Sequence, residues 1–145
     1  MCFDAGAAAV AADPAGFARV QWDTWSPPGW FDDAEFAATA RAFANPDWLP
    51  ITLNAYRSRF LADEPHDDRY AALAGRLAAT ERITVPTLMI QGGDDRCDHP
   101  AGSEGLEPYF TGPYERLVID RAGHFPHREV PEEVANALLR RFASV

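Results

Sequence analysis

Cysteine is scarce in this sequence, which has only Cys2 and Cys97 among its 145 residues. Two cysteines are too few for a disulfide framework, so the composition favours a reducing compartment. Long apolar runs are also missing, and no window approaches the roughly 20 residues that a membrane-spanning helix needs. Residues 1–17 are rich in alanine, lack a basic stretch and contain two aspartates, which makes a poor signal peptide. We therefore expect a cytoplasmic protein without a membrane segment.

Basic residues are outnumbered by acidic ones, 13 to 22, and the formal net charge is −9 with a pI near 4.7. An acidic surface repels phosphate-rich partners, which argues against nucleic acid and against anionic membranes. With 47% hydrophobic and 24% charged residues, the composition is that of a globular protein rather than a disordered one. The length allows one ordinary domain.

Residues 1–82 read as a helical region rich in alanine and aromatic residues. The Pro27-Pro28-Gly29 stretch ends a first helix, and Asp32 or Asp33 can cap the next one. Apolar side chains then recur at the spacing of one helix face. The expected helices are residues 17–22, 31–43, 48–60 and 70–79.

The pattern changes at Ile83 to strand, helix, strand, helix. Short, continuously apolar runs at 85–90 and 115–120 are typical of strands that are covered on both faces. A brief helix is expected at 103–110, and Pro131 suits the first turn of a final helix. Two strands leave unpaired edges and little surface for helices to cover, so we expect this segment to be one end of a larger sheet. The residues of the final helix expected to face inward are Val134, Leu138, Leu139 and Phe142.

Polar residues follow both expected strands. Gly92-Gly93-Asp94-Asp95 comes after the first, and Ala122-Gly123-His124-Phe125 comes after the second. Because the carboxyl ends of neighbouring parallel strands meet at one edge of a sheet, we expect Asp95 and His124 to lie within hydrogen-bond reach. A carboxylate that orients a histidine makes the imidazole an effective general base. The alternatives are a solvated turn acid and a turn histidine packed beside its neighbour.

These motifs resemble the α/β-hydrolase superfamily, and within it the epoxide hydrolase and haloalkane dehalogenase branch. The resemblance runs from Trp22 to Phe142 and is carried by residues 83–95, 109–115 and 122–125. It implies an α/β fold in which a helical cap, residues 1–82, precedes the C-terminal part of the hydrolase core, residues 83–145. That part would be the β-α-β-α end of the sheet, with the N-terminal strands missing.

The resemblance also implies residue roles. His124 corresponds to the base and Asp95 to the acid of a nucleophile–His–acid triad, with Asp94 and Asp98 as rivals for the acid. Tyr56 corresponds to a cap tyrosine that could donate a proton to an epoxide oxygen, and the alternative is an ordinary helix tyrosine. Four tryptophans could line an apolar pocket, although packing is the simpler account for most of them: Trp22, Trp25, Trp30 and Trp48.

The nucleophile of such a triad is not found in the sequence. The family places it within a Gly-x-Nuc-x-Gly elbow that follows a strand. Ser103 comes nearest, with Gly105 two positions after it, but Ala101 stands where the first glycine belongs. The motif is also absent around the remaining serines, which are Ser26, Ser58 and Ser144. The chain therefore resembles the cap and C-terminal portion of a hydrolase, as a truncated product, a split subunit or a degenerate relative.

Two functions follow. The first is a partial hydrolase for a small apolar ester, epoxide or halide, completed by an N-terminal hydrolase segment that bears the nucleophile. The second is a non-catalytic remnant that binds a small apolar ligand, or a partner such as another copy, through its sheet edge. Neither function calls for a cofactor. A metal site is not expected, because the polar residues do not have the spacing of a zinc motif: Asp94, Asp95, Asp98, His99, His124 and His127.

Overall fold

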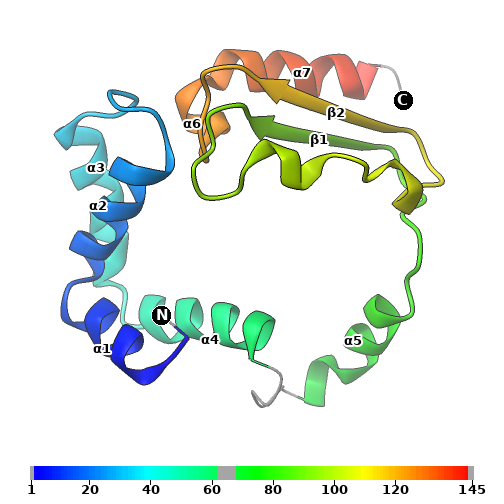
Figure 1. Ribbon diagram of the computed structural model, residues 1–145. Helices are drawn as coiled ribbons and strands as arrows, with labels where there is room; N and C mark the ends of the chain where they lie inside the picture. Colours follow the sequence, from blue (N-terminus) through cyan, green and yellow to red (C-terminus); the bar gives the residue numbers. More distant parts are fainter. Residues whose placement is uncertain (1, 62–67, 144–145) are drawn as a thin grey trace. The chain divides into compact units, whose positions relative to one another are not determined.

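The computed structural model describes residues 2–61 and 68–143. The chain divides into two compact units, Met1–Gln21 with Phe31–Ala79, and Trp22–Trp30 with Thr80–Val145. The first unit is helical and the second contains a sheet (Figure 1). Among the helices of residues 2–61 and 68–143, none combines the length and the apolar character that a bilayer crossing requires.

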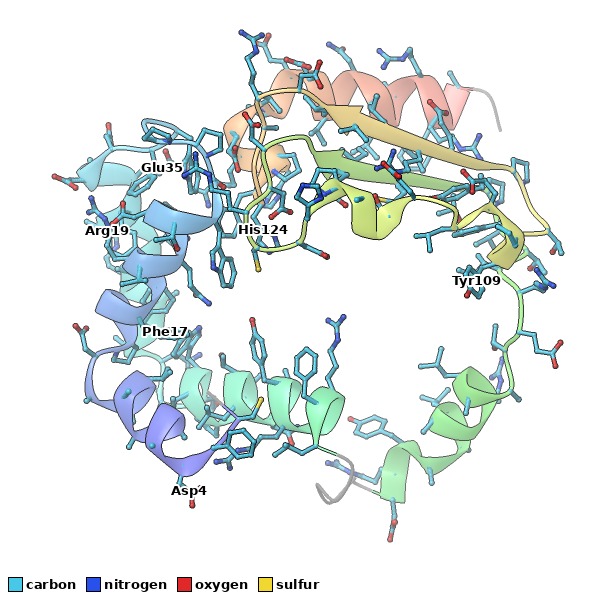
Figure 2. All side chains as sticks on the ribbon, in the orientation of Figure 1. Asp4, Phe17, Arg19, Glu35, Tyr109 and His124 are labelled. Carbon is cyan, nitrogen blue, oxygen red and sulfur yellow. The ribbon has the colours of Figure 1, made fainter. Side chains whose placement is uncertain are left out.

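Helices of the first unit lie near the predicted ranges 31–43, 48–60 and 70–79, but the helix Asp4–Ala12 was not predicted and the helix Pro14–Trp25 extends beyond 17–22 at both ends. Asp32 caps α3 (Asp33–Ala40), since its Oδ1 accepts the backbone N–H of Glu35 at 2.8 Å. Arg19, which Figure 2 labels on α2 (Pro14–Trp25), donates to Asp33 at 2.8 Å and lies over the rings of Phe31 and Phe36. It therefore joins α2 to α3. The helices are α1 (Asp4–Ala12), α2 (Pro14–Trp25), α3 (Asp33–Ala40), η1 (Arg41–Ala44), α4 (Trp48–Phe60), η2 (Asp68–Tyr70) and α5 (Ala71–Ala78).

The second unit is built on two parallel strands, β1 (Thr87–Gly92) and β2 (Tyr114–Ile119). Their register pairs Thr87 with Tyr114 and Gly92 with Ile119, so both strands end at the same edge. Two helices, α6 (Pro126–Glu129) and α7 (Pro131–Ala143), follow β2. The core beside the strand ends consists of Ile119, Ala122 and Val134, with Ile90, Leu117 and Val130 packed against it.

The connection between the strands differs from its prediction. Instead of one helix over 103–110 there are two short 3₁₀ helices, η3 (Pro100–Ser103) and η4 (Glu107–Tyr109). Gly105 has a φ of 69°, which no residue of a right-handed helix adopts. Pro108 has no N–H to donate. These two residues interrupt a continuous right-handed helix.

The inward face of α7 was predicted only in part. Val134 is buried as expected, and Ala137 is buried with it. The prediction is wrong for Leu138, Leu139 and Phe142, which are 39%, 66% and 74% exposed. Leu139 and Phe142 lie nearly opposite the buried Ala137 around the helix, so the burial of Ala137 leaves them on the exposed side.

Residues 22–30 belong to the second unit, although residues 31–79 of the first unit separate them in sequence from the rest of it. The backbone N–H of Arg96 donates to the carbonyl oxygen of Trp25 at 3.1 Å, which joins this segment to the loop after β1. The indole of Trp30 donates to the carbonyl oxygen of Trp22 at 3.1 Å and closes the segment on itself. The functional division into cap and core at residues 82 and 83 remains a prediction.

Candidate active site

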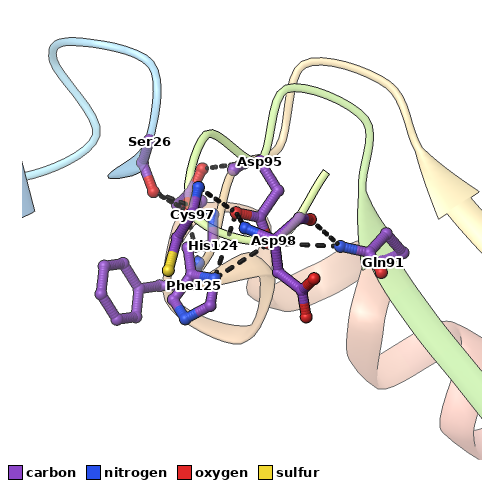
Figure 3. A network of polar contacts seen from close by, with 9 residues as sticks. Ser26, Gln91, Asp95, Cys97, Asp98, His124 and Phe125 are labelled. Atoms are coloured by element: carbon purple, nitrogen blue, oxygen red, sulfur yellow. Dashed lines mark hydrogen bonds and ion pairs between the residues drawn. The ribbon is translucent and has the colours of Figure 1, made fainter. Parts of the chain in front are cut away.

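Asp95 lies in the loop after β1, and its side chain is only 5% exposed. Its Oδ1 accepts the backbone N–H groups of Cys97 and Asp98, each at 2.9 Å. Its Oδ2 accepts the side-chain amide of Gln91 at 3.2 Å, and the same amide donates to the carbonyl oxygen of Asp98 at 2.8 Å (Figure 3). These bonds compensate the burial of the carboxylate and fix its direction.

His124 lies in the loop after β2 and faces Asp95. Its Nδ1 is 2.9 Å from Oδ2 and 3.1 Å from Oδ1 of Asp95, although 29 residues separate the two in sequence. The predicted proximity is therefore confirmed. Because a carboxylate only accepts, this geometry places the imidazole proton on Nδ1 and leaves a lone pair on Nε2. The histidine side chain is 29% exposed, and within the described residues Nε2 has no hydrogen-bond partner.

The histidine loop, residues 122–125, is held by two side chains outside it. Glu129 accepts the backbone N–H of Gly123 at Oε2 and that of Phe125 at Oε1, at 2.5 and 2.8 Å. The hydroxyl of Ser26 accepts the N–H of His124 at 3.0 Å and donates to Oε1 of Glu129 at 2.7 Å. Ser26 has no exposed surface.

Two glycines permit this close packing. A Cβ on Gly123 would lie 2.5 Å from Cα and 2.6 Å from Oγ of Ser26. A Cβ on Gly92 would lie 2.0 Å from the carbonyl oxygen of Gly123. Side chains at either position would push the histidine loop away from Ser26 or from the end of β1.

Aromatic rings enclose one side of the imidazole. Trp25 meets the His124 ring edge-on, with centroids 4.9 Å apart, and Phe125 does so at 5.2 Å. Trp30 stacks on Phe125 at 5.3 Å, and Trp22 lies 4.6 Å from Trp30. These packing contacts restrict the imidazole and exclude water from that side.

The structure also describes most of the other candidate residues. Asp94 and Asp98 are exposed, and neither carboxylate contacts His124. Tyr56 is half-buried on α4 in the first unit and stacks on Phe60 at 6.1 Å. His99 and His127 are exposed, and Trp48 packs on Phe43. Ser144 is outside the described residues.

Ser103 does not resemble an activated nucleophile. Its hydroxyl donates to the carbonyl oxygen of Pro100 at 2.9 Å and accepts from Nε of Arg116 at 2.8 Å. Arg116 also donates to that carbonyl oxygen, so the serine anchors η3 to β2. The contacts of Ser103 are structural.

Cys97 neighbours the acid but is poorly suited to nucleophilic attack. Although Cys97 is an exposed residue, partial burial raises the pKa of its thiol, and the charges of Asp95 and Asp98 raise it further. A smaller share of the thiolate is therefore present at neutral pH than for a free cysteine. Across residues 2–61 and 68–143, no three His, Cys, Asp or Glu side chains gather as metal ligands.

Sequence reasoning missed Gln91, Ser26 and Glu129. Gln91 carried a weak signal, a polar residue near the end of an apolar strand. Glu129 follows the histidine closely and could have been suspected as a loop acceptor. Ser26 gave no signal, because its contact with His124 spans 98 residues.

Comparisons with known proteins agree with this architecture. Residues 2–137 match the model of the alpha/beta hydrolase family. A candidate epoxide hydrolase from Klebsiella pneumoniae subsp. pneumoniae MGH 78578 is 37% identical, with a TM-score of 0.87 over 97% of this chain and 46% of that one. Epoxide hydrolase A of Mycobacterium tuberculosis (strain ATCC 25618 / H37Rv) is 38% identical over 61 residues, which are 42% of this chain and 19% of that protein.

A more distant structure, epoxide hydrolase CorEH without ligand, shares the fold at a TM-score of 0.69 and 22% identity, over 97% of this chain and 46% of its own. The chain thus spans less than half the length of these relatives. Since the family model covers nearly all of it, the chain belongs to the alpha/beta hydrolase family and is epoxide hydrolase-like.

Proposed function

We propose that this chain supplies the acid and the base of an epoxide-hydrolysing enzyme whose nucleophile comes from polypeptide outside the 145 residues. The observation that carries the proposal is the Asp95–His124 pair, 2.9 Å apart at the ends of two parallel strands. The names of the Klebsiella and Mycobacterium relatives favour an epoxide over the ester and halide that a hydrolase of this fold could also take.

In this proposal His124 acts as a general base. Nε2 takes a proton from water as the water oxygen attacks the covalent intermediate formed with the nucleophile. Asp95 keeps Nδ1 protonated and stabilises the imidazolium that results. Release of the nucleophile then yields a diol. Tyr56 is proposed to donate its phenolic proton to the epoxide oxygen when the nucleophile bonds to an epoxide carbon and the bond between that carbon and the oxygen breaks. The proton that Nε2 takes from water returns to the phenolate through solvent at the end of the cycle, which restores both groups.

A chimera tests the proposal. This chain would replace the matching part of the Klebsiella protein, so that the rest of that protein supplies the missing strands. We expect the chimera to hydrolyse styrene oxide. His124→Ala should lower kcat by about 10⁴- to 10⁶-fold and Asp95→Asn by about 10⁴-fold, as in other triads. Asp94→Asn is the matched control and should change kcat little.

Other outcomes decide between the alternatives. Turnover of p-nitrophenyl esters or haloalkanes but not of epoxides would change the substrate and keep the roles. A folded chimera without any turnover would contradict the proposal and favour a binding protein. The 145-residue chain alone should show no meaningful turnover, because a base and an acid without a nucleophile lose most of the acceleration.

A further inference from the structure

The histidine loop makes three consecutive amide contacts with only two side chains. The N–H groups of Gly123, His124 and Phe125 go to Glu129, Ser26 and Glu129 in turn. The hydroxyl proton of Ser26 goes to the same carboxylate. The Ser26–Glu129 pair therefore accepts the backbone N–H groups of residues 123, 124 and 125, which lie on both sides of the imidazole.

We infer that Ser26 and Glu129 are positioning residues that set the direction of the His124 imidazole toward Asp95. This inference rests on the proposed role of His124 as the base. Neither residue touches the ring nitrogens, so both act through the backbone of residue 124. Their contacts fix the peptide groups on both sides of His124, and thereby the position and direction of the Cα–Cβ bond from which the imidazole extends.

The charge pattern explains why these two residue types are used. A carboxylate has only acceptor positions, so both oxygens of Glu129 can face N–H donors. A serine hydroxyl donates once and still accepts, which lets Ser26 join the His124 N–H to the carboxylate. Bonds from N–H groups to a charged acceptor are stronger than neutral ones, and this favours one loop conformation.

Two substitutions should break the arrangement in different ways. Ser26→Ala leaves the His124 N–H without its acceptor and removes a donor from Glu129. Glu129→Gln keeps the size of the side chain but sets an NH₂ group against at least one N–H donor. Ser103→Ala is the matched control for a buried serine, and Glu132→Gln is the control for an exposed glutamate on the next helix.

The tautomer of His124 is the readout, because it reports the Nδ1–H···Asp95 contact without any turnover. Solid-state NMR of ¹⁵N-histidine measures it in the full 145-residue chain whatever the size of the particles. The background substitutions His66→Gln, His99→Asn and His127→Gln leave His124 as the one labelled residue. Asp95→Ala supplies the spectrum of an imidazole that has lost its acceptor.

We expect the background protein to hold the Nδ1–H tautomer. In Ser26→Ala and Glu129→Gln the ratio of Nδ1–H to Nε2–H should fall on the order of fivefold, the ratio that one ordinary hydrogen bond is worth. Ser103→Ala and Glu132→Gln should leave it unchanged. Circular dichroism would establish that each variant remains folded.

Three outcomes would overturn the inference. The first is an unchanged tautomer ratio in both folded variants, and the second is an equal change in the Ser103→Ala control. The third is unfolding of both variants, since the pair would then maintain the fold rather than the imidazole. An inactive chimera would count against the proposed function but would leave this NMR result standing.

Discussion

At the scale of single residues, the site depends on close packing around Asp95 and the histidine loop. The carboxylate of Asp95 is surrounded by donors, and the histidine loop lies against Ser26 at the one residue of that loop without a side chain. Small changes of volume should therefore matter more here than changes of polarity on the surface.

Gly123→Ala should destabilise the chain by about 1–3 kcal/mol, because a Cβ at 2.5 Å from Ser26 forces the loop to move. Gly102→Ala is the matched control, since its Cβ would meet nothing closer than Asp98 at 3.6 Å. Thermal and urea unfolding of the two variants would measure the difference. Equal stability of both would contradict the packing described for the histidine loop.

Alkylation of Cys97 should depend on pH in a defined direction. Its pKa is raised by burial and by the carboxylates of Asp95 and Asp98, so at a given pH less thiolate is present and the reaction with iodoacetamide is slower. The rate should rise only at higher pH than for a free thiol. Asp98→Asn removes one charge and should accelerate the reaction at pH 7–8, as peptide mass spectrometry can follow. No acceleration would argue against the electrostatic contribution of Asp98.

The sequence allowed the Asp95–His124 contact to be predicted, because strand-end geometry brings the two loops to one edge regardless of side-chain detail. It did not allow Ser26 to be predicted. That contact depends on where residues 22–30 pack, and no local pattern encodes a partner 98 residues away.

At the scale of elements, local sequence patterns predicted some helices correctly and others incorrectly. The range 48–60 was predicted for α4 and is observed. The helix predicted over 103–110 is not observed, because Gly105 has a positive φ and Pro108 has no N–H to donate. The buried face of α7 was predicted incorrectly for Leu138, Leu139 and Phe142. Periodicity shows which residues share a side of a helix, but not how much of that side the neighbouring sheet can cover.

Asp32→Ala should cost about 1 kcal/mol of stability, since it removes the hydrogen bond that caps α3. Asp47→Ala is a close control, because Asp47 precedes α4 but makes no side-chain cap bond. Both changes remove one negative charge near a helix N-terminus, so the difference between them isolates the capping bond. Unfolding followed by circular dichroism would measure both, and equal losses would exclude a specific role for the cap.

At the scale of the whole molecule, the second unit exposes apolar surface and strand edges together. Within the described residues each strand pairs only with the other, and Leu139 and Phe142 are mostly exposed. Such a surface favours pairing with a complementary hydrolase segment or with another copy.

Light scattering of the purified chain should therefore show oligomers or aggregates at micromolar concentration. The double substitution Leu139→Glu and Phe142→Glu should shift the distribution toward monomer. Ile51→Glu, a change of the same kind at an exposed residue of α4, should not. A monodisperse, cooperatively melting wild-type monomer would contradict the prediction.

The length of chain between Ser26 and Glu129 has a kinetic consequence. Their bond joins residues 103 apart, whereas the Asp95–His124 bond joins residues 29 apart. Closing the longer loop costs about 1 kcal/mol more in chain entropy. On refolding, Asp95 and His124 can therefore form their hydrogen bond before residues 22–30 pack against the histidine loop. The imidazole would gain its final orientation only in a later, slower step, when residues 22–30 pack against the histidine loop.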